Sequence, residues 1–137
     1  MKKIFVLVSL LLVVSSAALA FQPELIGGAR NGGVALGLMA EHGRFYSANL
    51  RFGAEATSYS ARPVLLFYGA KFLLGNMGQM PTSLTLCVMA AFGNTSQAGL
   101  GLGVNIDRLF GYRPLFAELG VDFLETAKLQ LQLGFKF

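Results

Sequence analysis

Few residues of this 137-residue chain are suited to catalysis. His42 is the single histidine, and a Ser-His-acid hydrolase needs a serine within hydrogen-bond reach of the imidazole. Ser47 is near in sequence, but the alternation of its segment directs its side chain away, into the predicted interior. Cys87 is the single cysteine, so the sequence has no His/Cys cluster for a metal ion. We predict no enzyme activity and no catalytic, cofactor-binding or metal-binding residues, with His42 part of a tight connection at 41–44.

Charged residues offer a different chemistry, because eight of them fall on one face of the alternating segments described below. They are four cations and four anions: Arg51, Glu55, Lys71, Asp107, Glu118, Asp122, Lys128 and Lys136. If that face is enclosed, these charges must pair or be hydrated, since an isolated buried charge is very costly. We predict a structural ion-pair network that plugs a lumen. The alternative is a narrow path for water or ions lined by the same groups.

Period-two alternation runs through most of the chain after residue 20 and predicts β-strands. Large apolar residues take every second position, and glycine, small or polar residues take most of the positions between. The clear segments are 34–41, 46–55, 64–74, 84–92, 99–107, 115–123 and 128–137. Turn-forming residues separate them, at 41–44, 57–62, 75–81, 93–96, 108–113 and 124–126. The segment 64–74 is the least regular, because its second face is also largely apolar.

An eighth strand is predicted from Glu24 to Arg30, where the alternation is weak. It leads into Asn31-Gly32-Gly33, and Asn-Gly is a strong hairpin signal because a type I′ turn needs positive φ at both central residues. Bacterial single-chain barrels have even strand numbers, which also favours eight. The competing interpretation is one long, bent strand over 24–41.

The first twenty residues have the composition of a secretory signal peptide. Two lysines precede an apolar stretch over 4–14, and an A-x-A cleavage site ends at Ala20. We predict that 1–20 is removed and that 21–137 forms a single domain. Without the leader, basic residues number 11 − 2 = 9 against 7 acidic, so the net charge is near +2. That balance gives no electrostatic basis for a nucleic-acid partner.

The chain is 54% hydrophobic and 13% charged, about half the charge of an ordinary soluble domain. No segment after Ala20 reaches the roughly 18 apolar residues of a membrane-spanning helix, whereas a closed β-barrel spans with strands of about 9–11 residues. Glycine weakens an exposed strand but suits a crowded interior, so we place the glycine-rich face in the lumen and the large apolar face outside. The sequence therefore predicts an all-β, eight-stranded antiparallel up-and-down transmembrane barrel.

The chain resembles the small bacterial outer-membrane β-barrel proteins, the kind that includes the OmpA transmembrane domain and OmpX. The resemblance covers the whole of 21–137 and is most specific in the last strand, where a terminal aromatic follows alternating apolar residues: Leu129, Leu131, Leu133, Phe135 and Phe137. In that family such a strand is the signal read by the barrel-assembly machinery. The resemblance implies outer-membrane lipid and that machinery as partners and the cell outer membrane as location. The short connections depart from the family and weigh against roles that need long surface loops.

Aromatic residues near the predicted strand ends fit the interfacial girdles of membrane barrels: Tyr46, Tyr59, Phe92, Tyr112, Phe123 and Phe137. Phe110 and Tyr112 flank Gly111 in a connection and could anchor that turn at the headgroups. The function we expect is structural, in support of membrane integrity. The alternatives are a narrow pore, a lipid-modifying enzyme dependent on His42, and a soluble periplasmic barrel.

Overall fold

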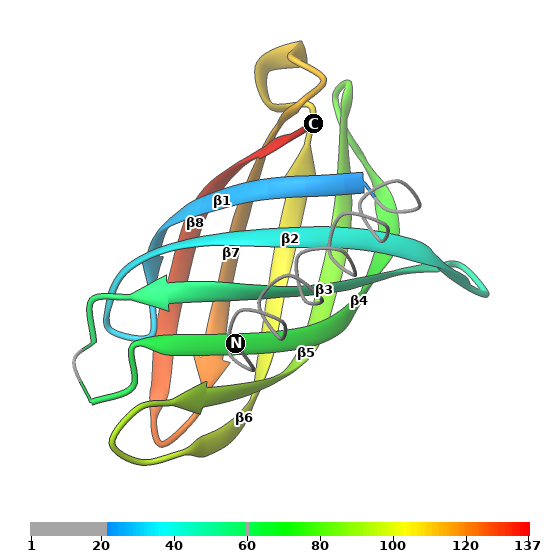
Figure 1. The fold of residues 1–137 in the computed structure, drawn as a ribbon. Coiled ribbons are helices and arrows are strands. Elements are labelled where there is room, and N and C mark those ends of the chain that lie inside the picture. The colour runs from blue at the N-terminus through cyan, green and yellow to red at the C-terminus, as the bar shows by residue number, and fades with distance from the viewer. Residues whose placement is uncertain (1–21, 60) are drawn as a thin grey trace, which may run out of the picture.

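The computed structural model describes residues 22–59 and 61–137, which form a single closed β-barrel. Eight strands follow one another around the ring in chain order, each antiparallel to the next, and β1 closes the ring against β8 (Figure 1). The predicted all-β, eight-stranded, antiparallel up-and-down barrel is thus confirmed. The predicted signal peptide, 1–20, lies outside the described residues.

The strands are nine to fourteen residues long. Their bounds are β1 Gln22–Arg30, β2 Gly33–Phe45, β3 Ala48–Thr57, β4 Val64–Met77, β5 Met80–Phe92, β6 Gln97–Asp107, β7 Leu115–Phe123 and β8 Ala127–Lys136. The turns therefore divide between two ends of the barrel. The loop end carries the β1–β2, β3–β4, β5–β6 and β7–β8 connections, and the terminal end carries the other three with the start of β1 and the end of β8.

The two faces of the sheet have the sidedness that the alternation predicts. Leu102 and Leu131 are 45% and 56% exposed on the outer wall, whereas their neighbours Gly101 and Gln130 are buried inside. Successive side chains of a strand point to opposite faces, so this arrangement extends along every strand. The barrel consequently presents leucine, valine and phenylalanine outward and directs most of the glycines and charged residues of its strands inward.

The first hairpin confirms the predicted eighth strand. Asn31 and Gly32 have φ of 52° and 76°, as a type I′ turn requires, and β1 pairs with β2 from Gln22↔Glu41 to Arg30↔Gly33. The alternative of one long strand over 24–41 is therefore wrong.

Two predicted connections are wrong, because the strands continue through them. Residues 41–44 belong to β2, where His42 and Gly43 together lie opposite Leu50 in a β-bulge, and the turn follows at 46–47. The predicted turn 75–81 shortens to 78–79, between the ends of β4 and β5. A bulge absorbs extra residues while pairing resumes on both sides, so turn-like composition alone did not locate these turns.

Large apolar side chains also enter the lumen, which the sequence predicted to hold small residues and charges. They form one buried cluster: Ile26, Met39, Leu65, Phe67, Met89, Ala91 and Phe116. Gly134 makes room for the largest of them, since a Cβ there would lie 2.0 Å from Cζ of Phe116. The apolar second face of β4 noted in the sequence thus fills one side of the interior.

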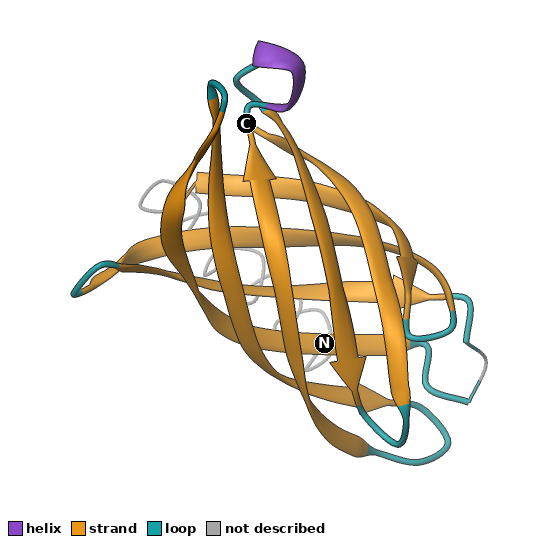
Figure 2. Ribbon diagram, turned by 180° about the vertical axis from the view of Figure 1, so that it is seen from behind, coloured by secondary structure: helices purple, strands orange, loops and turns teal. Residues whose placement is uncertain are grey.

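The β6–β7 connection contains a single 3-10 turn, Leu109–Gly111, which lies beside the end of β8 (Figure 2). No helix among the described residues is long and apolar enough to cross a membrane.

Candidate functional site

The lumen contains three groups of ion pairs, and Arg30 is the centre of the first. As the last residue of β1, it extends into the lumen near the loop end and donates from Nη1 to Glu55 at 2.9 Å. Its Nε and Nη2 donate to the two oxygens of Asp122, at 2.9 and 3.3 Å. The guanidinium also lies 4.9 Å from the ring centroid of Phe67. Arg30 therefore links β3 and β7 across the barrel, in a fork geometry suited to carboxylates.

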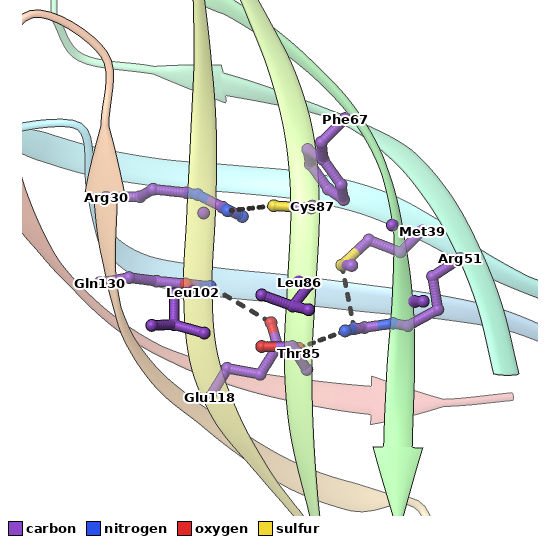
Figure 3. Close-up of a pocket in the computed structure, with 13 residues that line it drawn as sticks. Arg30, Met39, Arg51, Phe67, Thr85, Leu86, Cys87, Leu102, Glu118 and Gln130 are labelled. Carbon is purple, nitrogen blue, oxygen red and sulfur yellow. Dashed lines mark hydrogen bonds and ion pairs between the residues drawn. The ribbon is translucent and has the colours of Figure 1, made fainter. Parts of the chain in front are cut away.

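Arg51 is the centre of the second group. Its Nη1 donates to Glu118, and its Nη2 donates to Glu24 at 3.1 Å. Gln130 and Asn105 add amide donors to the same Glu118 carboxylate, each at 3.2 Å. Figure 3 shows that carboxylate between Arg51 and Gln130, with Arg30 entering from the opposite side of the view. Each Glu118 oxygen is thus hydrogen-bonded inside a site that excludes bulk water.

The third group lies toward the terminal end and uses lysines. The Lys71 ammonium is 2.9 Å from both Glu41 and Asp107. Lys136 is 2.8 Å from Asp107, and it lies 3.9 Å from Glu24 of the second group. The second and third groups are therefore joined electrostatically along the barrel axis.

Neutral amide groups add hydrogen bonds to the carboxylates of the lumen, which outnumber its cations. The three groups contain four cations and six carboxylates, so some carboxylate oxygens depend on amides. Gln132 supplies one such donor to Glu55 at 3.1 Å, besides the donors to Glu118. Buried carboxylates are tolerated only when their lone pairs are satisfied in this way.

Little free space is left between the first and second groups. The cavity that Arg30, Arg51, Cys87 and Glu118 help to line has a volume of about 20 Å³, which is room for about one water molecule. The Cys87 thiol is free, and its sulfur lies 3.9 Å from Nη2 of Arg30. Chemically, this arrangement can brace the barrel and block the lumen.

Of the eight predicted network residues, the structure brings seven together: Arg51, Glu55, Lys71, Asp107, Glu118, Asp122 and Lys136. The exception is Lys128, which lies half-buried at the loop end with its ammonium 4.7 Å from the ring centroid of Tyr59. Lys128 is the register partner of Asp122 near the start of β8, but Arg30 binds that carboxylate and the Lys128 side chain contacts the aromatic ring instead.

Sequence reasoning missed three members of the network, Glu24, Arg30 and Glu41. Extending the alternation through β1 would have placed Glu24 and Arg30 on the same face as Ile26. The glycines at 27 and 28 obscured that signal. Glu41 was assigned to a connection, whereas it is the last regular pair of β2 before the bulge.

The loop end has its own polar contacts, centred on Arg62 in the β3–β4 connection. Its Nε donates to Thr95 of the β5–β6 connection at 3.1 Å, and its Nη2 donates to Glu125 of the β7–β8 connection. This hydrogen bond and the Arg62 charge lower the pKa of Glu125 below its ordinary value. Arg62 thus fastens three connections over the loop end of the lumen.

His42, interpreted from the sequence as a turn residue, is instead a strand residue in the β2 bulge. Its ring centroid lies 5.3 Å from those of Phe52 and Tyr68, two side chains of the outer wall. Among residues 22–59 and 61–137, no group of three His, Cys, Asp or Glu side chains is arranged to hold a metal ion.

The predicted assembly signal forms an exposed stripe on the outer face of β8 and on the residue that follows it: Leu129, Leu131, Leu133, Phe135 and Phe137. The rings of Phe135 and Phe137 are 5.5 Å apart, and Tyr112 lies 6.4 Å from Phe135. The backbone N–H of Phe137 donates to the carbonyl of Pro23 at 3.0 Å. The stripe therefore runs along the seam where β8 meets β1.

Comparison with known proteins returned no protein-family model, no curated protein and no solved structure that matches this chain.

Proposed function

We propose that this protein is an integral β-barrel of the bacterial outer membrane, with a plugged polar lumen and a structural role in membrane integrity. Its partners would be outer-membrane lipid and, during biogenesis, the barrel-assembly machinery, after export through a cleaved signal peptide at 1–20. We assign it no catalytic role. The observation that carries the proposal is the sidedness of the wall, apolar outside and charged inside.

Burial energetics support a lipid environment for the outer wall. Exposed large apolar residues occur on all eight strands, for example Leu36, Val88 and Leu129 at 61%, 58% and 79% exposure. Soluble proteins rarely expose contiguous apolar patches beyond a few hundred Å², and this face encircles the barrel. In hydrocarbon the same face has no solvation penalty, and a closed ring leaves no strand edge unpaired.

Strand length supports the same conclusion. A tilted strand crosses a bilayer with about 9–11 residues, and the strands here have nine to fourteen. The unequal lengths arise mainly at the terminal end, where β4 continues to Met77 beyond Phe72, its last pair with β3.

The filled lumen favours a plug over the alternative of a narrow pore. Arg30 and Arg51 each bridge carboxylates from different strands, and the space between them holds about one water molecule. An eight-stranded barrel is only wide enough for side chains to fill it.

Fractionation tests the location directly. The full-length chain, expressed in a Gram-negative host, should be recovered in the outer-membrane fraction, require detergent for extraction, and migrate differently on gels with and without heating. Recovery in the soluble periplasm without detergent would refute the membrane proposal.

Planar-bilayer recording separates the plug from the pore. The wild-type protein should show no stepwise conductance, whereas replacing Arg30 and Arg51 together by alanine should produce measurable current by emptying the lumen. The Lys128→Ala variant, which removes a cation outside the ion-pair network, is the matched control and should stay silent. Steady single-channel steps from the wild-type protein would establish the pore instead.

A further inference from the structure

The turns at the two ends of the barrel differ in chemistry. At the loop end the connections are mainly small and polar, as in 93–96, with Tyr59 and Leu124 as the larger residues. Arg62 fastens three of them to one another. At the terminal end the connections 46–47, 78–79 and 108–114 contain aromatic, apolar and basic residues and no acidic residue. The β4–β5 hairpin adds Met77, which is 52% exposed.

Two of the terminal-end turns hold an aromatic residue in a strained backbone conformation. Tyr46 and Phe110 have φ of 56° and 54°, and each side chain is 89% exposed. Positive φ in a bulky residue is a genuine outlier. In the β1–β2 hairpin at the loop end, the positive-φ positions are occupied by Asn31 and Gly32. These residue types adopt positive φ with less steric strain than an aromatic residue does.

Backbone strain of this kind is characteristic of functional positions. Packing within the barrel does not explain the conformation of Phe110, because this residue exposes nearly all of its surface. The strain instead presents two aromatic rings outward at the same end of the barrel.

Two arginines accompany these rings, and their charge faces outward. Arg108 and Arg113 flank the 3-10 turn and are both exposed. Neither forms an ion pair with another residue of the described chain. The nearby acids Glu41 and Asp107 face the lumen, where they bind Lys71 and Lys136. The outer surface of this end is therefore basic.

We propose that this surface, the terminal rim, binds anionic phospholipid headgroups. The rim consists of six residues: Tyr46, Met77, Arg108, Phe110, Tyr112 and Arg113. The inference rests on the proposed function, because a rim can meet headgroups only if the barrel wall lies in the bilayer. Aromatic rings favour the bilayer interface, and guanidinium groups bind phosphate through paired hydrogen bonds. The charge of the rim selects an anionic lipid over a neutral one.

Tryptophan fluorescence tests the position of the rim, since the chain contains no tryptophan. Three single variants are folded into phosphatidylcholine vesicles: Phe110→Trp in the rim, Asn94→Trp at the loop end, and Leu131→Trp at mid-wall. Each variant is first shown to be folded by its circular dichroism and heat-dependent gel migration. Brominated lipid should quench the Leu131→Trp and Phe110→Trp variants, and aqueous iodide should quench the Asn94→Trp variant.

Lipid selectivity tests the chemistry of the rim. Quenching of the Phe110→Trp variant is measured with brominated phosphatidylglycerol and with brominated phosphatidylcholine at low mole fraction. An arginine near an anionic surface contributes about 1 kcal/mol, so the preference for phosphatidylglycerol should be of order fivefold per arginine. Adding Arg108→Gln and Arg113→Gln should remove the preference and leave quenching by total lipid unchanged.

The outcomes separate the two proposals. If brominated lipid does not quench the Leu131→Trp variant, the membrane proposal itself fails. If it quenches that variant while iodide quenches Phe110→Trp, the rim lies outside the bilayer and the headgroup proposal is refuted, as for a surface that meets a protein partner. Equal quenching of Phe110→Trp by both brominated lipids would refute the selectivity for anionic headgroups.

Discussion

The Arg51→Met variant is the sharpest test of the ion-pair network. Arg51 is buried and forms hydrogen bonds with Glu118 and Glu24. Methionine preserves most of the side-chain volume but removes the charge. Glu118 then keeps its two amide donors, whereas the closest remaining cation to Glu24 is Lys136, at 3.9 Å.

Breaking a buried ion pair by removing one partner typically costs about 3–5 kcal/mol, because the remaining charge stays buried. We expect the free energy of unfolding of Arg51→Met to fall by that amount. Adding Glu118→Gln neutralises one stranded carboxylate at nearly constant shape, so the double variant should regain about 1 kcal/mol or more. Lys128→Met is the control, since its loss removes only a cation–π contact worth about 0.5–1 kcal/mol.

Urea unfolding of the protein in phosphatidylcholine vesicles, followed by circular dichroism, gives these free energies by linear extrapolation. The reasoning would be refuted if Arg51→Met were no less stable than Lys128→Met. It would equally be refuted if Glu118→Gln destabilised the Arg51→Met background further.

Three other predictions concern the wall, the packing and the loop end. Gly134→Ala should cost about 1–3 kcal/mol in urea titrations through overpacking against the phenylalanine ring beneath it, whereas Gly27→Ala, with its nearest contact at 3.3 Å, should cost less. Leu131→Arg should destabilise the protein in bilayers by about 2–4 kcal/mol, and an effect near zero would contradict a lipid-facing wall. In an NMR titration Glu125 should titrate below the ordinary pKa of glutamate, and Arg62→Gln should raise that pKa. Arg62 lowers the pKa of Glu125 in the folded state. The contact between Arg62 and the ionised Glu125 therefore stabilises the fold at neutral pH, and this stabilisation is lost as the pH falls through that pKa.

Alternation predicted seven of the strands, because a period of two leaves each residue only two possible faces. The eighth strand also needed the hairpin signal and the even strand number of such barrels, and the sidedness needed the glycine content of one face. Leu102 and Gly101 illustrate this, since their types alone assign them outward and inward. The Asn31-Gly32 turn was equally predictable, because few residue pairs adopt positive φ at low cost.

The network was only partly predictable, because it depends on register and on where strands end. Arg30 pairs with Glu55 and Asp122, which are 25 and 92 residues away in the sequence. Glu41 precedes a bulge, and nothing in its local composition distinguishes a bulge from a turn. The reach of Lys128 to an aromatic ring likewise follows from its position at a strand end and not from its alternation.

The seam between β1 and β8 has a consequence for assembly. It is joined by six residue pairs, against thirteen between β4 and β5, so it is the most sparsely paired contact in the ring. Yet β1 also contributes Glu24 and Arg30, whose side chains cross the lumen. Glu24 binds Arg51 of β3, and Arg30 binds Glu55 of β3 and Asp122 of β7. Until β1 docks, Glu55 and Asp122 face one another without their shared cation. Docking of β1 therefore both closes the ring and supplies the cation that Glu55 and Asp122 share, so strand pairing at the seam is coupled to formation of the first ion-pair group.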